Sequence, residues 1–200
     1  YEFAADEANA LISKLADEEM KRRSIELCLD AYKSLGKYEL EIDLIKKMGN
    51  QINSGQQIML QQYEAQAYLD LAAKDSSKSK KYEKKALEIF KQIKKSGYST
   101  FRLEENIAIL YENQGDLDSA QKQLQQMQED YSDDYRVYKR LAFLEADKQQ
   151  HLENRARDYT QMKKYYDRAE ELYKTQDKED IEMSTLDAQM QDVIDGGWLN

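Results

Sequence analysis

Residues 107–127 read IAILYENQGDLDSAQKQLQQM, and their spacing of apolar residues around a single glycine occurs twice in the chain. The shared intervals join Cys28, Leu29, Tyr32, Gly36, Glu41, Ile45 and Met48 in one stretch and Ile107, Ala108, Tyr111, Gly115, Ala120, Leu124 and Met127 in the other. Apolar residues three and four apart form a stripe on a helix, and a glycine ends that helix before the next begins. Each stretch therefore predicts an antiparallel helix pair, which buries its apolar face only by stacking on neighbouring pairs.

The composition supports an all-α, well-solvated protein. Of the 200 residues, 40% are hydrophobic and 34% charged; proline is absent and glycine occurs seven times, which disfavours a β-rich fold with many turns. No apolar run approaches the ~20 residues needed to cross a bilayer, and no signal-peptide pattern opens the chain. Because the chain begins at Tyr1 in helix-like sequence, we expect a soluble segment of a longer protein, either cytoplasmic or attached to a membrane anchor.

The pattern divides the chain into stacked units of one domain, residues 1–200. We expect a truncated unit at 1–18, repeats at 19–54, 55–98, 99–133 and 134–176, and a capping helix within 177–200. A loop is expected over Gly49 to Gly55. The capping helix presents Met183, Leu186, Met190, Val193 and Ile194, and Trp198 is expected to pack against it after the Gly196–Gly197 stop.

Two of the repeats carry insertions. Tyr68 precedes Tyr111 by 43 residues, whereas Phe90 precedes Leu124 by 34, so nine extra residues lie within the second repeat. The polar stretch at 75–79 predicts that they lengthen its turn. In the fourth repeat an insert of eight residues around 148–157 lengthens either a helix or the turn.

These residues resemble the tetratricopeptide repeat family, whose unit has about 34 residues. The likeness covers residues 21–175 and is carried by Ala108, Tyr111, Gly115, Asp116, Ala120 and Leu124, and again by Tyr32, Gly36, Tyr38 and Ile45. It implies an α-α superhelix, a right-handed solenoid of antiparallel helix pairs. The sequence departs from the pattern at Glu41, where a small alanine is usual. The inserts and the Gly-Gly-Trp-Leu ending also resemble repeat regions of larger Gram-positive bacterial proteins, including membrane-anchored Ser/Thr kinases.

Catalytic chemistry has few candidate residues. His151 is the only histidine and lies in a polar insert, and Cys28 is the only cysteine, so neither a triad nor a metal cluster can be assembled. We therefore expect a protein that is not an enzyme and that binds neither a metal nor a cofactor. The net charge of −9 opposes nucleic-acid binding. A lysine-rich stretch over 78–95 is interpreted as a solvated helix face, with an anion-binding patch as the alternative.

The family resemblance places a binding groove on the first helix of each pair. In that register the groove presents Gln62, Gln66, Asn106, Ile109, Asn113, Arg136, Lys139, Arg140 and Phe143. Some family members hold a peptide carboxylate at such places, and Asn106, Arg136 and Arg140 match part of that clamp. Gln62 and Gln66 depart from it because amides carry no charge.

The sequence thus predicts a protein-interaction scaffold that binds a peptide or protein partner in a concave groove. Arg136, Lys139 and Arg140 lie within one turn of each other, which predicts an anchor for an acidic or C-terminal group. An accessory sensor or regulatory domain, for example of a membrane-anchored Ser/Thr kinase, is the alternative. A third interpretation is self-association through the capping helix.

Overall fold

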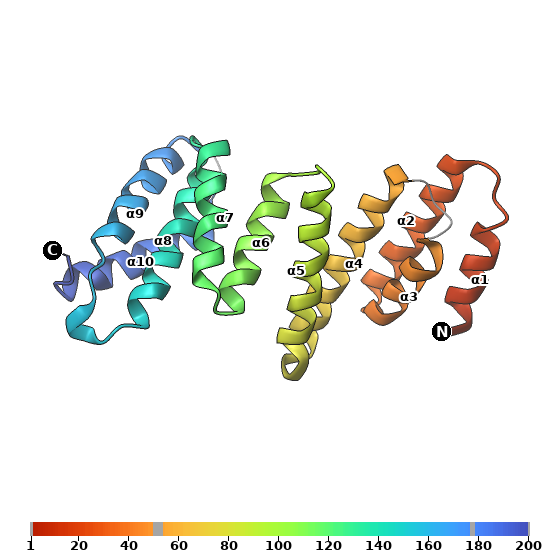
Figure 1. Cartoon of the computed structure of the whole chain (residues 1–200), viewed down its shortest axis with the longest axis horizontal. Coiled ribbons are helices and arrows are strands. Elements are labelled where there is room, and N and C mark those ends of the chain that lie inside the picture. The colour runs from red at the N-terminus through yellow and green to blue at the C-terminus, as the bar shows by residue number, and fades with distance from the viewer. Residues whose placement is uncertain (1, 50–53, 177–178, 200) are drawn as a thin grey trace. The chain divides into compact units, whose positions relative to one another are not determined.

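The computed structural model describes residues 2–49, 54–176 and 179–199, and every regular element among them is helical (Figure 1). The α-helices are α1 (Glu2–Ile12), α2 (Glu18–Ser34), α3 (Tyr38–Met48), α4 (Ser54–Lys74), α5 (Ser79–Lys95), α6 (Phe101–Asn113), α7 (Leu117–Asp130), α8 (Tyr135–Gln150), α9 (Thr160–Tyr173) and α10 (Ile181–Asp195). Two single-turn 3₁₀ helices, η1 (Ser76–Lys78) and η2 (Asn154–Ala156), complete them. The predicted all-α class is confirmed. Of the loop expected at 49–55, residues 50–53 lie outside the described residues.

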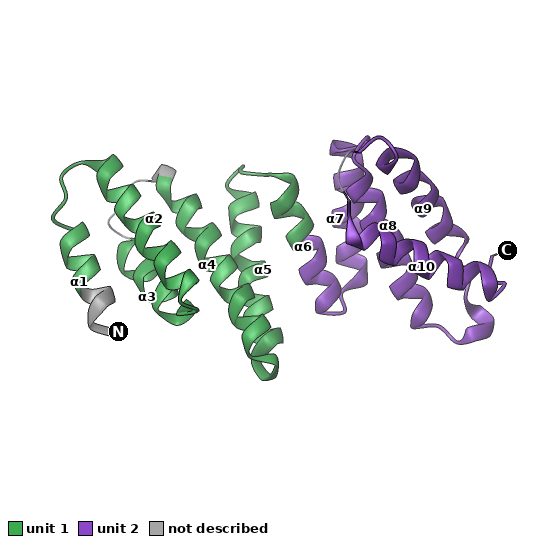
Figure 2. Cartoon of the chain, turned by 180° about the vertical axis from the view of Figure 1, so that it is seen from behind, with its two compact units in different colours: residues 1–106 green, residues 107–200 purple. Residues whose placement is uncertain are grey.

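The chain forms two compact units, residues 1–106 and 107–200, coloured separately in Figure 2. The division falls inside α6, so it does not follow the repeat boundaries. The assignment of all residues to one domain stays a prediction. None of the described helices is long and apolar enough to cross a membrane.

Unit 1 is built on the contact of α2 and α3 with α4, while α4 pairs along its length with α5. Ile25 and Leu29 of α2 meet Leu44 and Met48 of α3 in a core with almost no exposed surface. Burial of such side chains contributes roughly 1.5–3 kcal/mol each, which offsets the entropy of ordering these short helices. The apolar stripes read from the sequence therefore face the core as expected.

The repeated glycines end their helices with the same backbone motif. Gly36 and Gly115 have φ of +63° and +79°, a region that residues with a Cβ rarely adopt. The N–H of Gly115 donates to the carbonyl of Glu112 at 2.8 Å, and that of Asp116 donates to Tyr111 at 2.9 Å. The corresponding bonds after α2 are Gly36 to Lys33 and Lys37 to Tyr32, both 2.9 Å. This Schellman motif confirms the turn predicted from each glycine.

The insert of the second repeat lies mainly in its helices, which corrects the expectation of a longer turn. Helix α4 continues to Lys74, six residues past Tyr68, whereas α6 ends two residues past Tyr111. Helix α5 likewise begins seven residues before Ala86, against three for α7 before Ala120. In the fourth repeat the insert falls mostly in the connection between α8 and α9, which contains η2.

Unit 2 is closed by α10, which packs against both α8 and α9. Met183, Leu186, Met190 and Val193 are buried there, which confirms the predicted capping helix, although Ile194 is exposed. Trp198 packs against this end as expected: its ring centroid lies 5.8 Å from that of Tyr159, and its carbonyl accepts the Tyr159 N–H at 3.2 Å.

Candidate functional site

Three of the predicted site residues line one groove in unit 1. Gln62 and Gln66 stand one turn apart on α4, and Asn106 belongs to α6. The groove has a volume of about 330 Å³ and is completed by Asp30, Lys33, Tyr63, Phe90, Thr100, Arg102 and Leu103. The structure thus brings together amide side chains that are 44 residues apart in the sequence.

The polar groups of this groove are of mixed charge. Tyr63 donates its hydroxyl hydrogen to Asp30 at 2.9 Å, and burial together with this bond raises the pKa of Tyr63 to about 12. Gln66 donates to Asp70 at 3.0 Å through its amide nitrogen, which leaves its carbonyl oxygen as an acceptor. Lys33 and Arg102 add two exposed cations. The groove therefore offers donors and acceptors to a ligand, with positive charge at two points.

A buried carboxyl group lies within reach of the charges on α2 and α4. Glu41 of α3 has no exposed surface, and neither of its carboxylate oxygens has a hydrogen-bond partner among the residues that the structure describes. Burial raises its pKa to about 7; Lys33 opposes this shift, and Asp70 and Asp30 reinforce it. At neutral pH the group is therefore partly protonated, which is how a protein avoids an unpaired buried charge.

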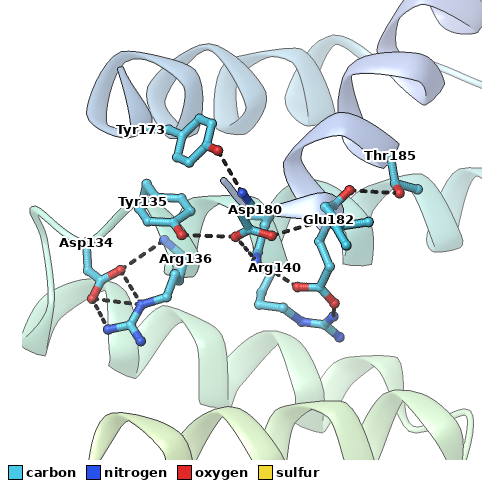
Figure 3. A network of polar contacts seen from close by, with 10 residues as sticks. Asp134, Tyr135, Arg136, Arg140, Tyr173, Asp180, Glu182 and Thr185 are labelled. Atoms are coloured by element: carbon cyan, nitrogen blue, oxygen red, sulfur yellow. Dashed lines mark hydrogen bonds and ion pairs between the residues drawn. The ribbon is translucent and has the colours of Figure 1, made fainter. Parts of the chain in front are cut away.

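The three predicted cations of unit 2 are paired with carboxylates of the same chain. Figure 3 shows two of them, Arg136 beside Asp134 and Arg140 beside Glu182. Lys139 is only 3% exposed, and its Nζ lies 2.6 Å from both Asp180 and Glu182. Arg136 is exposed and pairs with Asp134 at 2.6 Å. Hydrogen bonds from Lys139 and Tyr135 outweigh the effect of burial and hold the pKa of Asp180 below its usual value.

Arg140 and Phe143 line a second pocket, which lies wholly within unit 2. The guanidinium of Arg140 donates to Glu112 at 2.5 Å and lies 5.9 Å from the centre of the Phe143 ring. Asn113, exposed at the end of α6, and the half-buried Ile109 do not line it. The predicted role of Arg136, Lys139 and Arg140 in holding an acidic group stays a prediction, and each already has a carboxylate partner.

Sequence reasoning missed several of these polar residues. Asp30 and Lys33 of the first groove occupy the positions of Ile109 and Glu112 in the repeated spacing, so applying the groove register to α2 would have found them. Asp180 and Glu182 gave no such signal, because they meet Lys139 only through the packing of α10.

The described residues contain no group of three or more His, Cys, Asp or Glu side chains placed to hold a metal ion. His151 is exposed, and its Nδ1 lies 2.7 Å from the carbonyl oxygen of Asp147. Neither observation identifies a catalytic centre.

Solved structures share this architecture at low sequence identity. A MamA structure, described as the RS-1 ArsTM double mutant, superposes with a TM-score of 0.57 at 13% identity, covering 89% of this chain and 97% of that one. TTC0263, a thermophilic TPR protein of Thermus thermophilus, gives a TM-score of 0.52 at 16% identity, covering 94% of this chain and 98% of the other. No protein-family model and no curated protein sequence matches the chain. Taken with the repeated helix pairs and their glycine turns, these likenesses show that the chain has the tetratricopeptide-type repeat fold.

Proposed function

We propose that this chain is a non-catalytic scaffold that binds an extended peptide segment of a partner protein in the groove of unit 1. The observation that carries the proposal is the meeting of Gln62, Gln66 and Asn106 around one groove. A primary amide both donates and accepts hydrogen bonds, so a row of amides matches the N–H and C=O groups of an extended backbone.

The charges of the groove support selectivity for the peptide's side chains. Lys33 and Arg102 favour an acidic residue or a terminal carboxylate near them, while Phe90 and Leu103 provide apolar contact. Asp30 contributes one carboxylate, which accepts the Tyr63 hydroxyl, so it cannot neutralise both Lys33 and Arg102. A scaffold built in this way needs no catalytic group and no cofactor.

The proposal is tested with peptides selected by display on the full chain. We expect the triple variant Gln62→Ala, Gln66→Ala, Asn106→Ala to lose at least about tenfold in affinity by calorimetry, since each hydrogen bond contributes on the order of 1 kcal/mol. Gln92→Ala, at an exposed amide on α5 of the same unit, is the matched control and should bind as the parent does. Equal affinities for the triple variant and the parent, or a selection that yields no peptide above background, would contradict the proposal.

A further inference from the structure

The second pocket lies in unit 2, where the end of α6 meets residues 140–150 of α8 and residues 182–189 of α10. It has a volume of about 440 Å³, and its polar lining comes mainly from Glu112, Arg140, Asp147, Glu182 and Gln189. Phe143 of α8 provides an apolar wall. The pocket is therefore built by three helices that the sequence separates widely, and it is distinct from the groove of unit 1.

Three buried polar atoms of this pocket have no hydrogen-bond partner among the described residues. They are Oε1 of Glu112, Nε of Arg140 and Oε1 of Gln189. Glu112 and Arg140 bind each other through their other atoms, so both side chains are held in place while these two atoms stay unpaired. An unpaired buried polar atom is costly, and several such atoms on side chains that line one cavity are typical of a site that a ligand completes.

The charge around the pocket is negative overall. Glu112, Asp147 and Glu182 contribute three carboxylates against the single guanidinium of Arg140. Lys139, on the same helix as Arg140, is buried and paired with Asp180 and Glu182. Burial raises the pKa of Glu112; Arg140 opposes this shift and Asp147 and Glu182 increase it, as expected where carboxylates crowd together.

We propose that this pocket binds the cationic side chain of a lysine or arginine from a partner peptide. The ammonium or guanidinium of that residue donates to Oε1 of Glu112 and to Oε1 of Gln189, which are the two unpaired acceptors. The backbone carbonyl of the same residue accepts the hydrogen of Arg140 Nε, the unpaired donor. The aliphatic part of the side chain lies against Phe143. This ligand has the opposite charge to the acidic group expected at Arg140 from the sequence, because carboxylates from α6, α10 and the second half of α8 reverse the sign.

The test uses four small probes on the ¹⁵N-labelled full chain: the N-acetyl methylamides of lysine, arginine, norleucine and glutamate. NMR reports the side-chain N–H of Arg140 and the side-chain amide of Gln189 directly. We expect saturable shifts of both signals with the lysine or arginine probe, weakening as salt is added, and no saturable shift with the norleucine or glutamate probe. The two cationic probes decide which head group is preferred.

A matched pair of variants on α10 checks the location. Gln189→Ala removes one acceptor and should lower the affinity for the cationic probe by about fivefold, which corresponds to the loss of a single hydrogen bond. Gln191→Ala changes an exposed amide of the same helix and should leave the affinity unchanged. Tighter binding of the glutamate probe, equal binding of all four probes, or no saturable shift with either cationic probe overturns the proposal. Because these probes do not require the groove of unit 1, the result is independent of the proposed peptide groove.

Discussion

The ammonium group of Lys139 on α8 lies 2.6 Å from the carboxylate of Asp180, the residue that caps the N-terminus of α10. The other carboxylate oxygen of Asp180 accepts the backbone N–H of Glu182 at 2.9 Å, and Tyr135 donates to the side chain as well. The backbone N–H of Asp180 in turn donates to the hydroxyl of Tyr173 on α9 at 2.8 Å. One residue therefore joins three helices of unit 2 (Figure 3).

We expect Asp180→Ala to lower the free energy of unfolding by about 3 kcal/mol, because it leaves a buried ammonium short of its partner and removes a helix cap. Glu182 keeps part of the charge compensated, since it also contacts Lys139. Asp192→Ala, at an exposed aspartate of the same helix, is the control and should change stability by less than about 0.5 kcal/mol. Chemical denaturation measures both, and equal effects would show that the Lys139 contact is not stabilising.

The raised pKa of Glu41 should make the stability of the fold depend on pH. Its pKa is about 7 in the folded chain against an ordinary value of 4.5, so the folded state binds the proton more tightly. The stability that this group contributes is fully present below about pH 4.5 and is lost as the pH rises to about 7. At 1.36 kcal/mol per unit, the loss is about 3 kcal/mol.

The measurement compares the parent with Glu41→Gln, which keeps the shape of the side chain but does not titrate. The difference between their free energies of unfolding should change by about 3 kcal/mol between pH 4.5 and 7.5, with the parent losing more. A difference that stays constant over this range would mean that Glu41 titrates normally in the folded state.

A substitution at Ala120 tests the packing of the repeat at residues 99–133. Ala120 has no exposed surface on α7, so Ala120→Leu should overpack the helix crossing and cost roughly 1–3 kcal/mol. Gln123 of the same helix is half-buried, so the exposed Gln125 is the control. Thermal unfolding of Ala120→Leu and Gln125→Leu should separate them, and matching midpoints would argue against the repeat register.

The sequence predicted those parts of the fold that depend on local patterns. The apolar spacing around Gly36 and Gly115 specified helix pairs and their turns, because a positive φ and a 3.6-residue stripe are both local properties. The position of the insert in the second repeat was predicted wrongly, because it depends on tertiary packing and not on a local pattern. Its Ser and Asp residues suggest a turn, but Ala72, Ala73 and Lys74 favour helix, and the pairing of α4 with α5 extends both helices.

The candidate sites were only partly predictable from sequence. The register predicted that Gln62, Gln66 and Asn106 share a surface, since all three belong to first helices of pairs, and these residues do line one groove. It did not predict that Lys139 would be neutralised by Asp180, 41 residues further along the chain. That pairing depends on how α10 docks, a tertiary contact that no spacing within one helix encodes.

The most direct test of the peptide groove is NMR mapping of the full chain with a display-selected peptide. We expect the side-chain amide signals of Gln62, Gln66 and Asn106 to shift together with saturation, and these shifts to disappear in the triple alanine variant of these residues. Shifts confined to the lysine-rich face of α5, or to residues of unit 2, with the three amides unmoved, would contradict this assignment of the groove.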